Sequence, residues 1–460
     1  MVRSDYLVIG AGATALAFVD SVFHQTEATF TIVDRRDLPG GHWNDAYPFV
    51  RLHQPARMYG VASLPFGDIG IEQVGSNRGL APLASGAQVS GHFHEFVYET
   101  LLQSGRVTYL PLTEYRGDGE CVSLLSGEVT RVSAPVTVDA TLMEATIPLT
   151  HQRSFEVAPG AACVAPNSLS RVAAGYRHFA VLGAGKTALD VVNWLLGNGV
   201  AHGQVTWVRP RDAWLYNREF CQPGPHFMAE TARLQSAQYE AIATATSLED
   251  LGPRLEAAEM WFRIDHDVLP SMFHGATVSR AELEQARLVR DVVRGSHVKA
   301  VEPDQLVLEG GDHPLPPGTL TIDCTASGLG NNVGVVQPVF STGRIALQML
   351  RQYQPTFSSA LIGHIEVNVP DEAARAAMTN VASMTDTVAD WVAGVATTMR
   401  NQAAWLGEPA VRDWLATCRL DLTSSWNDPA VTPEALTATV GQLRSYIPAA
   451  MQNIPRLLAR

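Results

Sequence analysis

The sequence predicts an α/β protein in which one parallel strand–turn–helix–strand unit occurs twice and a mostly helical C-terminal region follows. Two glycine-rich turns, each directly after a short apolar strand, carry the first part of this prediction. The first turn begins at Gly10 and the second at Gly183. Residues 371–458 are expected to be helical, and four tryptophans are expected to act as packing anchors there: Trp391, Trp405, Trp414 and Trp426.

The first turn has the spacing that a bound dinucleotide requires. Gly10, Gly12 and Ala15 follow an apolar strand in a G-x-G-x-x-A pattern. The first two glycines let the backbone turn tightly and approach a pyrophosphate, whose charge then faces the N-terminus of the next helix. Asp34 follows the second strand, where a carboxylate can accept hydrogen bonds from ribose hydroxyls, and Arg35 adjoins it. A glycine turn without a ligand is the alternative, but the strand, helix and terminal acid together favour a nucleotide.

The second turn repeats this pattern but ends differently. Its second strand leads into Arg209 and Arg211, with no acid at the ribose position. Arginine there can pair with a 2′-phosphate, so the sequence favours NADPH over NADH. The alternative is that both arginines are solvated surface charges. The candidate residues within the turn itself are Gly183, Gly185, Lys186 and Thr187.

Composition excludes several classes of partner. The 460 residues carry 33 basic and 46 acidic side chains, a net charge of -13, which gives no general electrostatic footprint for nucleic acid or anionic lipid. No run of about 18 apolar residues predicts a membrane span. Five scattered cysteines fit a reduced, cytoplasmic compartment, and their spacing predicts neither a metal site nor a redox dithiol. Whether the chain forms a homo-oligomer is left open.

A third stretch of sequence makes the comparison specific. Residues 40–43 read Gly-Gly-His-Trp and are followed by Tyr47, Pro48 and Arg51, while residues 325–328 read Thr-Ala-Ser-Gly. Across roughly residues 5–330, this order of motifs resembles that of flavin-containing monooxygenases and related Baeyer–Villiger monooxygenases, as a divergent member. The resemblance implies two Rossmann-like dinucleotide-binding domains in a glutathione-reductase-like layout, one for FAD and one for NADPH.

The resemblance also implies a division of the chain. Residues 1–170 are expected to form the first part of the FAD-binding domain, and residues 171–325 an inserted NADPH-binding domain. Residues 326–460 would then contain the return to the FAD domain and the helical region. Consecutive glycines at 40–41 permit close approach to the flavin, where Trp43 could cover an apolar ring face or simply be a core aromatic. Gly41, His42 and Trp43 are therefore candidate cofactor contacts.

Several residues depart from the family pattern. The family's F-x-G-x-x-x-H fingerprint before the second turn is not reproduced around Phe155. Two residues after Arg51 this chain has His53 where Baeyer–Villiger relatives carry aspartate, and Gln54 stands before a proline where flavin-containing monooxygenases have asparagine. Gln54 could hydrogen-bond near the flavin, and His53 could act as a general acid or base. Packing without a catalytic role is an equal alternative for both.

The predicted function follows from the two nucleotide units. The chain is expected to be an NADPH-dependent FAD monooxygenase that transfers one oxygen atom from O₂ to a nitrogen, sulfur or carbonyl carbon of a small-molecule substrate. An NADPH-dependent flavin reductase, dehydrogenase or oxidase without oxygen transfer is the alternative, and a flavin-binding regulatory protein is a third. Arg51, His53 and Gln54 are the candidate catalytic residues.

The remaining segments give weaker expectations. A helix is expected from an N-cap at Ser90 to about Gly105. Residues 106–140 should contain a small antiparallel insertion, and residues 229–260 and 281–293 should be helical.

Overall fold

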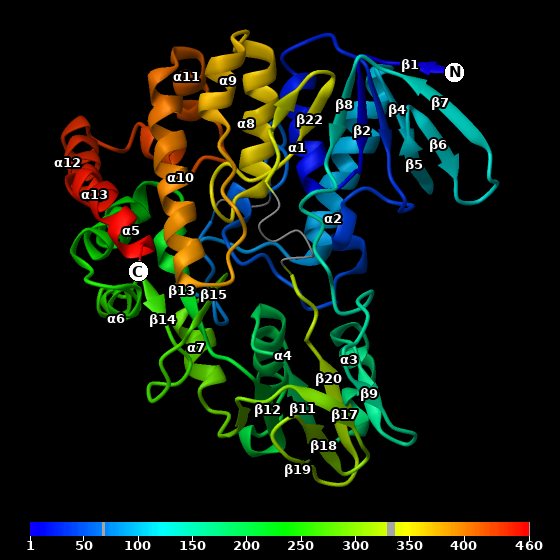
Figure 1. The fold of residues 1–460 in the computed structure, drawn as a ribbon, viewed down its shortest axis with the longest axis vertical. Coiled ribbons are helices and arrows are strands. Elements are labelled where there is room, and N and C mark those ends of the chain that lie inside the picture. Colours follow the sequence, from blue (N-terminus) through cyan, green and yellow to red (C-terminus); the bar gives the residue numbers. More distant parts are fainter. Residues whose placement is uncertain (67–69, 329–335, 460) are drawn as a thin grey trace.

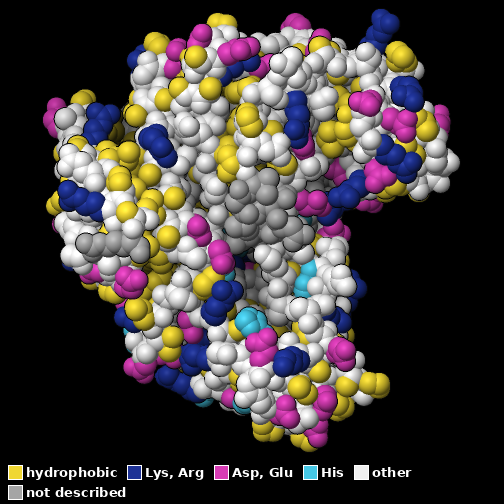
Figure 2. Space-filling model, viewed as in Figure 1, with side chains coloured by type: hydrophobic (Ala, Val, Ile, Leu, Met, Phe, Trp, Pro, Cys, Tyr) yellow, Lys and Arg dark blue, Asp and Glu magenta, His cyan; other side chains and the backbone are white. Residues whose placement is uncertain are grey.

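The computed structural model describes residues 1–66, 70–328 and 336–459. Two parallel sheets lie at opposite ends of the molecule, and a helical layer flanks them (Figure 1). In the same view, the outline of the molecule is indented on one side between these two ends (Figure 2). The chain passes from the first sheet to the second and then returns, so that segments far apart in sequence complete each sheet.

The first sheet has the strand order β21-β22-β8-β2-β3-β4. All neighbouring strands except the β21/β22 hairpin are parallel. Apolar residues fill its central strands, because helices α1 and α8 cover it. The bounds are β2 Tyr6–Ile9, β3 Phe30–Val33, β4 Val107–Leu110, β8 Val136–Asp139, β21 Phe340–Ser341, β22 Arg344–Ala346, α1 Ala13–Phe23 and α8 Pro355–Asn368.

The predicted antiparallel insertion is present beside this sheet. Strands β5 (Thr113–Gly117), β6 (Glu120–Ser123) and β7 (Val129–Ser133) pair antiparallel, and β1 (Val2–Arg3) joins β7 in parallel. The helix before it begins earlier than predicted. Ser85, not Ser90, caps helix α2 (Gly86–Glu95) in a capping box with Gln88, because both side chains satisfy backbone N–H groups at the helix start. The helical segment still ends at Gly105, which has a φ of 71°.

The second sheet has the strand order β10-β20-β11-β12-β16 and is parallel throughout. Helix α4 follows β11 as the second glycine turn requires, and α3 precedes that strand. A small sheet of β9, β17, β18 and β19 lies beside it (Figure 1). The bounds are β10 Ala162–Val164, α3 Pro166–Val172, β11 His178–Leu182, α4 Lys186–Gly197, β12 Val205–Arg209, β16 Asp291–Arg294, β20 Thr319–Asp323, β9 Glu156–Val157, β17 Val298–Val301, β18 Gln305–Leu308 and β19 His313–Pro314.

Residues 213–278 leave the second sheet and join the C-terminal helices. Strands β13 (Ala213–Asn217), β14 (Trp261–Phe262) and β15 (Met272–Val278) form a separate sheet. Its aromatic side chains pack with Trp391 and with helices from both parts of the chain. These helices are α5 Met228–Thr244, α6 Leu248–Ala257, α10 Val388–Gly407 and α13 Ile447–Leu458. Helices α9 Glu372–Met378 and α11 Pro409–Thr417 contact α10, and α12 Pro433–Ser445 contacts α5.

One predicted helix is shorter than expected. Helix α7 covers Arg280–Ala286, and residues 291–293 belong to strand β16 at the edge of the second sheet. The two consecutive valines in this segment explain the change, because β-branched residues favour a strand where a sheet edge is available. None of the helices in the described part of the chain combines the length and apolar character needed to cross a bilayer.

Candidate functional site

The first glycine turn touches the Gly-Gly-His-Trp loop directly. Gly40 donates its backbone N–H to the carbonyl of Ala11 at 2.8 Å. A Cβ atom built on Gly41 would lie 3.1 Å from the Cα of Gly12. Gly10 has a φ of 101° and Gly41 a φ of 61°, so both occupy backbone conformations that glycine favours. Two motifs that lie about thirty residues apart in the sequence therefore form one backbone surface at the start of α1.

Asp34 lies where the sequence predicts, at the end of β3. Its carboxylate accepts hydrogen bonds from the backbone N–H of Ala11 at 2.5 Å and of Arg36 at 2.7 Å, and the residue is buried. These bonds fix the acid against the glycine turn. Arg35 instead faces solvent, where it pairs with Glu144 at 3.2 Å.

Trp43 is held by a residue that the sequence did not single out. Its indole N–H donates to the Tyr59 hydroxyl at 2.7 Å. Arg419, from the C-terminal region, donates to the carbonyls of Tyr59 at 2.8 Å and of Arg57 at 2.5 Å. The C-terminal region therefore orients the loop that supports Trp43, although no motif in that region could have predicted the contact.

Both candidate histidines are neutral at neutral pH. Burial and the nearby Arg36 charge lower the pKa of His42 to about 4. Burial, together with the charges of Lys186 and Arg218, lowers the pKa of His53 to about 3. An imidazole with such a pKa is uncharged near neutral pH. It can donate or accept a hydrogen bond, but it carries no extra proton that it could give up as a general acid.

The other two candidate catalytic residues lie in the same loop. Arg51 is partly exposed and forms an ion pair with Glu72, while a second N–H donates to the carbonyl of Leu83 at 2.8 Å. Gln54 is half-buried and next to His53. Arg218 donates to the carbonyl of His53 at 2.8 Å and so fixes the backbone of the loop between Arg51 and Gln54.

The second glycine turn lies against the end of strand β20. A Cβ atom on Gly183 would lie 2.5 Å from the carbonyl oxygen of Cys324, whereas one on Gly185 would meet no atom within 4 Å. Only glycine fits at the first position, where the strands crowd, and the second position is open to a ligand.

Lys186 and Thr187 start helix α4 beside the loop that contains Tyr47 and Phe49. Lys186 forms an ion pair with Asp190 one turn later. Asp190 also accepts a hydrogen bond from the Tyr47 hydroxyl at 2.7 Å, and Phe49 stacks on Trp194 with ring centroids 5.2 Å apart. The Tyr-Pro segment of the first unit therefore docks on the helix that begins at the second turn.

Arg209, the last residue of β12, and Arg211, two residues later, lie in different environments. Arg209 is only 2% exposed and pairs with Asp212 at 2.9 Å, and burial lowers its pKa to about 10. Arg294 also contacts Asp212, at 3.1 Å. Arg211 is exposed, and one guanidinium N–H points to the sulfur of Met272 at 3.4 Å. Arg211 is therefore the accessible cation of the two.

A cluster around the buried Asp323 links the two chain crossings between the sheets. Asp323, at the end of β20, contacts His151 at 2.8 Å and Arg153 at 3.1 Å through the same carboxylate oxygen. Its other oxygen accepts from the backbone N–H and hydroxyl of Thr325. Asp139, at the end of β8, binds Thr141 in the same way and pairs with Arg344 at 2.7 Å. In the sequence, both sites are marked by the same Asp-x-Thr pattern, which begins at the last residue of β8 and of β20.

Arg218 is a second residue whose role the sequence did not reveal. It is fully buried, and its guanidinium binds the carbonyls of His53 and Thr277, the amide oxygen of Asn77 at 3.0 Å and Glu282 at 2.7 Å. It therefore joins the Arg51–Gln54 loop to β15 and α7. In the described residues, no group of three or more His, Cys, Asp or Glu side chains is arranged to hold a metal ion.

Comparison with known proteins relates the chain to uncharacterized mycobacterial proteins. No family model matches it. Over 458 residues it is 40% identical to the uncharacterized protein Rv2000 of Mycobacterium tuberculosis. The alignment covers 99% of this chain and 85% of that protein. The uncharacterized protein Mb2023 of Mycobacterium bovis matches with the same identity and coverage.

Solved structures give the fold. An oxidized steroid monooxygenase bound to NADP aligns over 100% of this chain and 98% of its own, with a TM-score of 0.51 and 12% identity. A flavin-containing monooxygenase from Stenotrophomonas maltophilia aligns over 77% of this chain and 89% of its own, with a TM-score of 0.42 and 16% identity. The predicted α/β fold class with two Rossmann-like units and a helical C-terminal region is confirmed. The chain belongs to the family of these mycobacterial proteins and has the two-unit fold of flavoprotein monooxygenases.

Proposed function

We propose that this chain is a flavoprotein oxidoreductase that binds FAD at the first glycine turn, takes a hydride from NADPH at the second, and acts as a monooxygenase. In the overall reaction, NADPH, a proton, O₂ and the substrate give NADP⁺, water and a product that carries one oxygen atom. The proposed acceptor is a nitrogen, sulfur or carbonyl carbon of a small molecule. The observation that carries the proposal is the contact between Gly12 and Gly41, which unites the nucleotide turn and the flavin-side loop in one surface.

The residues at the first turn fit FAD. The backbone approach at Gly12 leaves no side chain between the turn and the Gly-Gly-His-Trp loop. Helix α1 has no acidic residue in its first turn and no side-chain cap, so its leading N–H groups suit a pyrophosphate. Asp34 would face the ribose, and Gly41, His42 and Trp43 would lie along the flavin. When bound, FAD supplies the capacity to accept a hydride and to reduce dioxygen.

The residues at the second turn fit a pyridine nucleotide. Helix α4 also lacks an acidic first turn and a side-chain cap, and Gly185 leaves space for a pyrophosphate. Lys186 would leave its ion pair with Asp190 and pair with a phosphate instead. Thr187 would donate a hydrogen bond to the same phosphate from the first turn of the helix. The exposed Arg211 is the cation best placed to pair with a 2′-phosphate, while the buried Arg209 is paired with Asp212.

The chain's own residues would position the reactants and exclude water. Tyr47 and Phe49 dock the first unit on helix α4, so they would limit how the two nucleotide sites can move apart. His53 is half-buried and its pKa of about 3 leaves it neutral, which makes its imidazole a hydrogen-bond donor or acceptor instead of a source of charge. Gln54 adds an amide beside it, and Arg51 holds the loop through Glu72. None of these side chains needs to form a covalent bond with the substrate.

The proposal is tested by following the oxygen atoms. Purified protein is first assayed for bound FAD and for bleaching of the flavin spectrum by NADPH without oxygen. It is then supplied with ¹⁸O₂ and a panel of amines, sulfides and ketones. One ¹⁸O atom in the product for each NADPH consumed would support monooxygenation.

Two other outcomes would overturn part or all of the proposal. Oxidation of NADPH with an equal amount of hydrogen peroxide across the whole panel would favour the oxidase or reductase alternative. Full-length, folded protein that binds no FAD, even after incubation with excess FAD, would exclude flavin chemistry altogether.

A further inference from the structure

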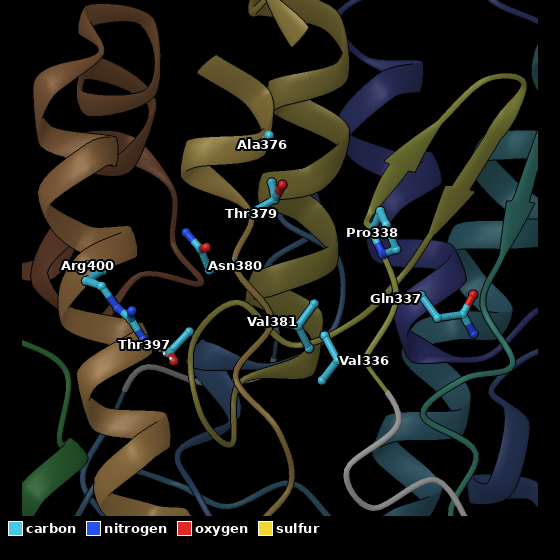
Figure 3. A pocket seen from close by; sticks show the side chains of 9 residues that line it. All are labelled: Val336, Gln337, Pro338, Ala376, Thr379, Asn380, Val381, Thr397 and Arg400. Atoms are coloured by element: carbon cyan, nitrogen blue, oxygen red, sulfur yellow. Dashed lines mark hydrogen bonds between the residues drawn. The ribbon is translucent and has the colours of Figure 1, made fainter. Parts of the chain in front are cut away.

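An open cavity of about 440 Å³ lies at the surface between the return segment of the chain and the C-terminal helices, and Val336, Pro338, Asn380 and Arg400 on its walls are exposed. Figure 3 shows residues 336–338 on one side, residues that end and follow α9 in the centre, and α10 on the other side. Cavities of this size hold small organic ligands in other proteins. None of the motifs found in the sequence contributes a side chain to it.

The cavity has an apolar part and a polar part. Val336, Pro338 and Val381 supply hydrocarbon surface, while Asn380 and Thr397 supply an amide and a hydroxyl. Arg400 is the one charged group among the residues that line it (Figure 3). This division suits a molecule with a short hydrocarbon body and one polar, negatively charged end.

Arg400 has no acidic partner among residues 1–66, 70–328 and 336–459 within ion-pair distance. Its guanidinium instead donates to the carbonyl of Ala396 at 3.4 Å and to the Thr397 hydroxyl at 3.2 Å, both on its own helix. In a chain with a net charge of -13, an arginine that lines a cavity without a carboxylate favours an anionic ligand.

The wall of the cavity is bonded to the edge of the first sheet. Gln348, two residues after the end of β22, accepts the backbone N–H of Gln337 at 3.1 Å and donates to its carbonyl at 2.8 Å. Next to Val381, Ala382 donates its N–H to the carbonyl of Met349 at 2.7 Å. Ligands of open α/β sheets bind beyond the carboxyl ends of the strands, and the cavity borders that edge.

From this geometry we infer that the cavity binds a small organic carboxylate, with Arg400 pairing with the acid group and Val336, Pro338 and Val381 packing on the hydrocarbon chain. Binding itself does not depend on the proposed function. Only the further statement that the carboxylate is the substrate, or a part of it, rests on the proposed function.

Binding of hexanoate to the full chain tests the inference, by calorimetry or ligand-observed NMR and without NADPH. Hexanamide has the same chain length without the charge, and Arg400 is exposed to solvent, so wild-type protein should bind hexanoate about fivefold more tightly. Arg400→Gln should remove that preference, and Arg400→Lys should keep part of it. Arg412→Gln is the matched control, because Arg412 is another exposed arginine, on the neighbouring helix α11 and paired with Asp413.

A second variant keeps the test independent of Arg400. Val381→Trp should fill the cavity and weaken both probes equally, with the far-UV circular dichroism spectrum unchanged. Equal affinity of wild-type protein for hexanoate and hexanamide, absence of hexanoate binding, or full binding by Arg400→Gln would each overturn the inference. Because no turnover is measured, failure of the flavin proposal would leave a positive result standing, and the ¹⁸O assay would report that failure separately.

Discussion

Gly12 and Gly41 meet backbone to backbone, so that a Cβ atom on Gly41 would lie 3.1 Å from the Cα of Gly12. This contact joins the turn that would hold a pyrophosphate to the loop that would lie along the flavin. It also makes the two motifs interdependent, because a side chain in one changes the path of the other.

Gly41→Ala should lower both the FAD content and the stability of the protein. The added methyl group meets Gly12 and forces a non-glycine residue to a φ of 61°, which together should cost about 1–3 kcal/mol. Flavin absorbance per protein and urea unfolding measure the two effects. Gly105→Ala is the control, since Gly105 has a φ of 71° but no atom within 4 Å of a new Cβ. Equal flavin loss in both variants would contradict a specific role for the contact.

Arg211→Gln should weaken NADPH use more than NADH use. Removing one charge-assisted partner of a 2′-phosphate should raise the KM for NADPH about tenfold or more and leave that for NADH unchanged. The steady-state rate of flavin reduction with each cofactor measures this difference.

Arg209→Gln is the informative counterpart to that substitution. It removes a cation from the buried Asp212, so it should lower the unfolding midpoint in urea and affect both cofactors alike. If Arg209→Gln instead acts on NADPH alone and Arg211→Gln has no effect, the assignment of the two residues is reversed.

Asp323→Asn should destabilise the joint between the two chain crossings. The substitution weakens the hydrogen bonds that the buried Asp323 carboxylate makes with the His151 side chain and with the exposed Arg153, which should cost about 2 kcal/mol. Chemical denaturation measures the change. Asp413→Asn, which alters an exposed pair with Arg412, should cost under about 1 kcal/mol. Similar losses in both variants would argue against a special role for the Asp323 cluster.

Stability should fall as the pH drops below about 6.5, the ordinary pKa of histidine. The pKa values of His42, His53 and His92 are lowered by burial to about 4, 3 and 3 in the folded protein. The unfolded chain therefore binds more protons between pH 6.5 and about 3, so the stabilisation present above 6.5 is lost on acidification.

His92 offers a direct test of this pH dependence. Its Nε2 accepts the backbone N–H of Val61 at 3.0 Å, which a glutamine side chain could also do. His92→Gln should make the fall in unfolding free energy shallower by up to about 1.4 kcal/mol per pH unit, the value for one proton. His297→Gln, at an exposed histidine, should leave the slope closer to that of wild-type protein.

Local sequence was sufficient where a short pattern dictates a local geometry. The two glycine turns, their flanking strands and Asp34 lie as predicted, because each needs only a strand, a turn and a helix that are contiguous in the chain. The helix start at Ser85 was missed because both Ser85 and Ser90 are plausible caps. Only the reciprocal bond with Gln88 distinguishes them.

The sequence by itself determined that this chain contains two nucleotide-binding units and a helical C-terminal region, since strand and helix periodicity and glycine spacing are local properties. Tertiary structure alone decided which charges are available. Arg209 and Arg211 are alike in sequence, yet burial beside Asp212 hides one and leaves the other exposed. It also brought Arg419 to Tyr59 and Asp323 to His151 across more than 150 residues. Such contacts depend on how the whole chain folds back, because the partners are specified by packing and burial and not by any short pattern.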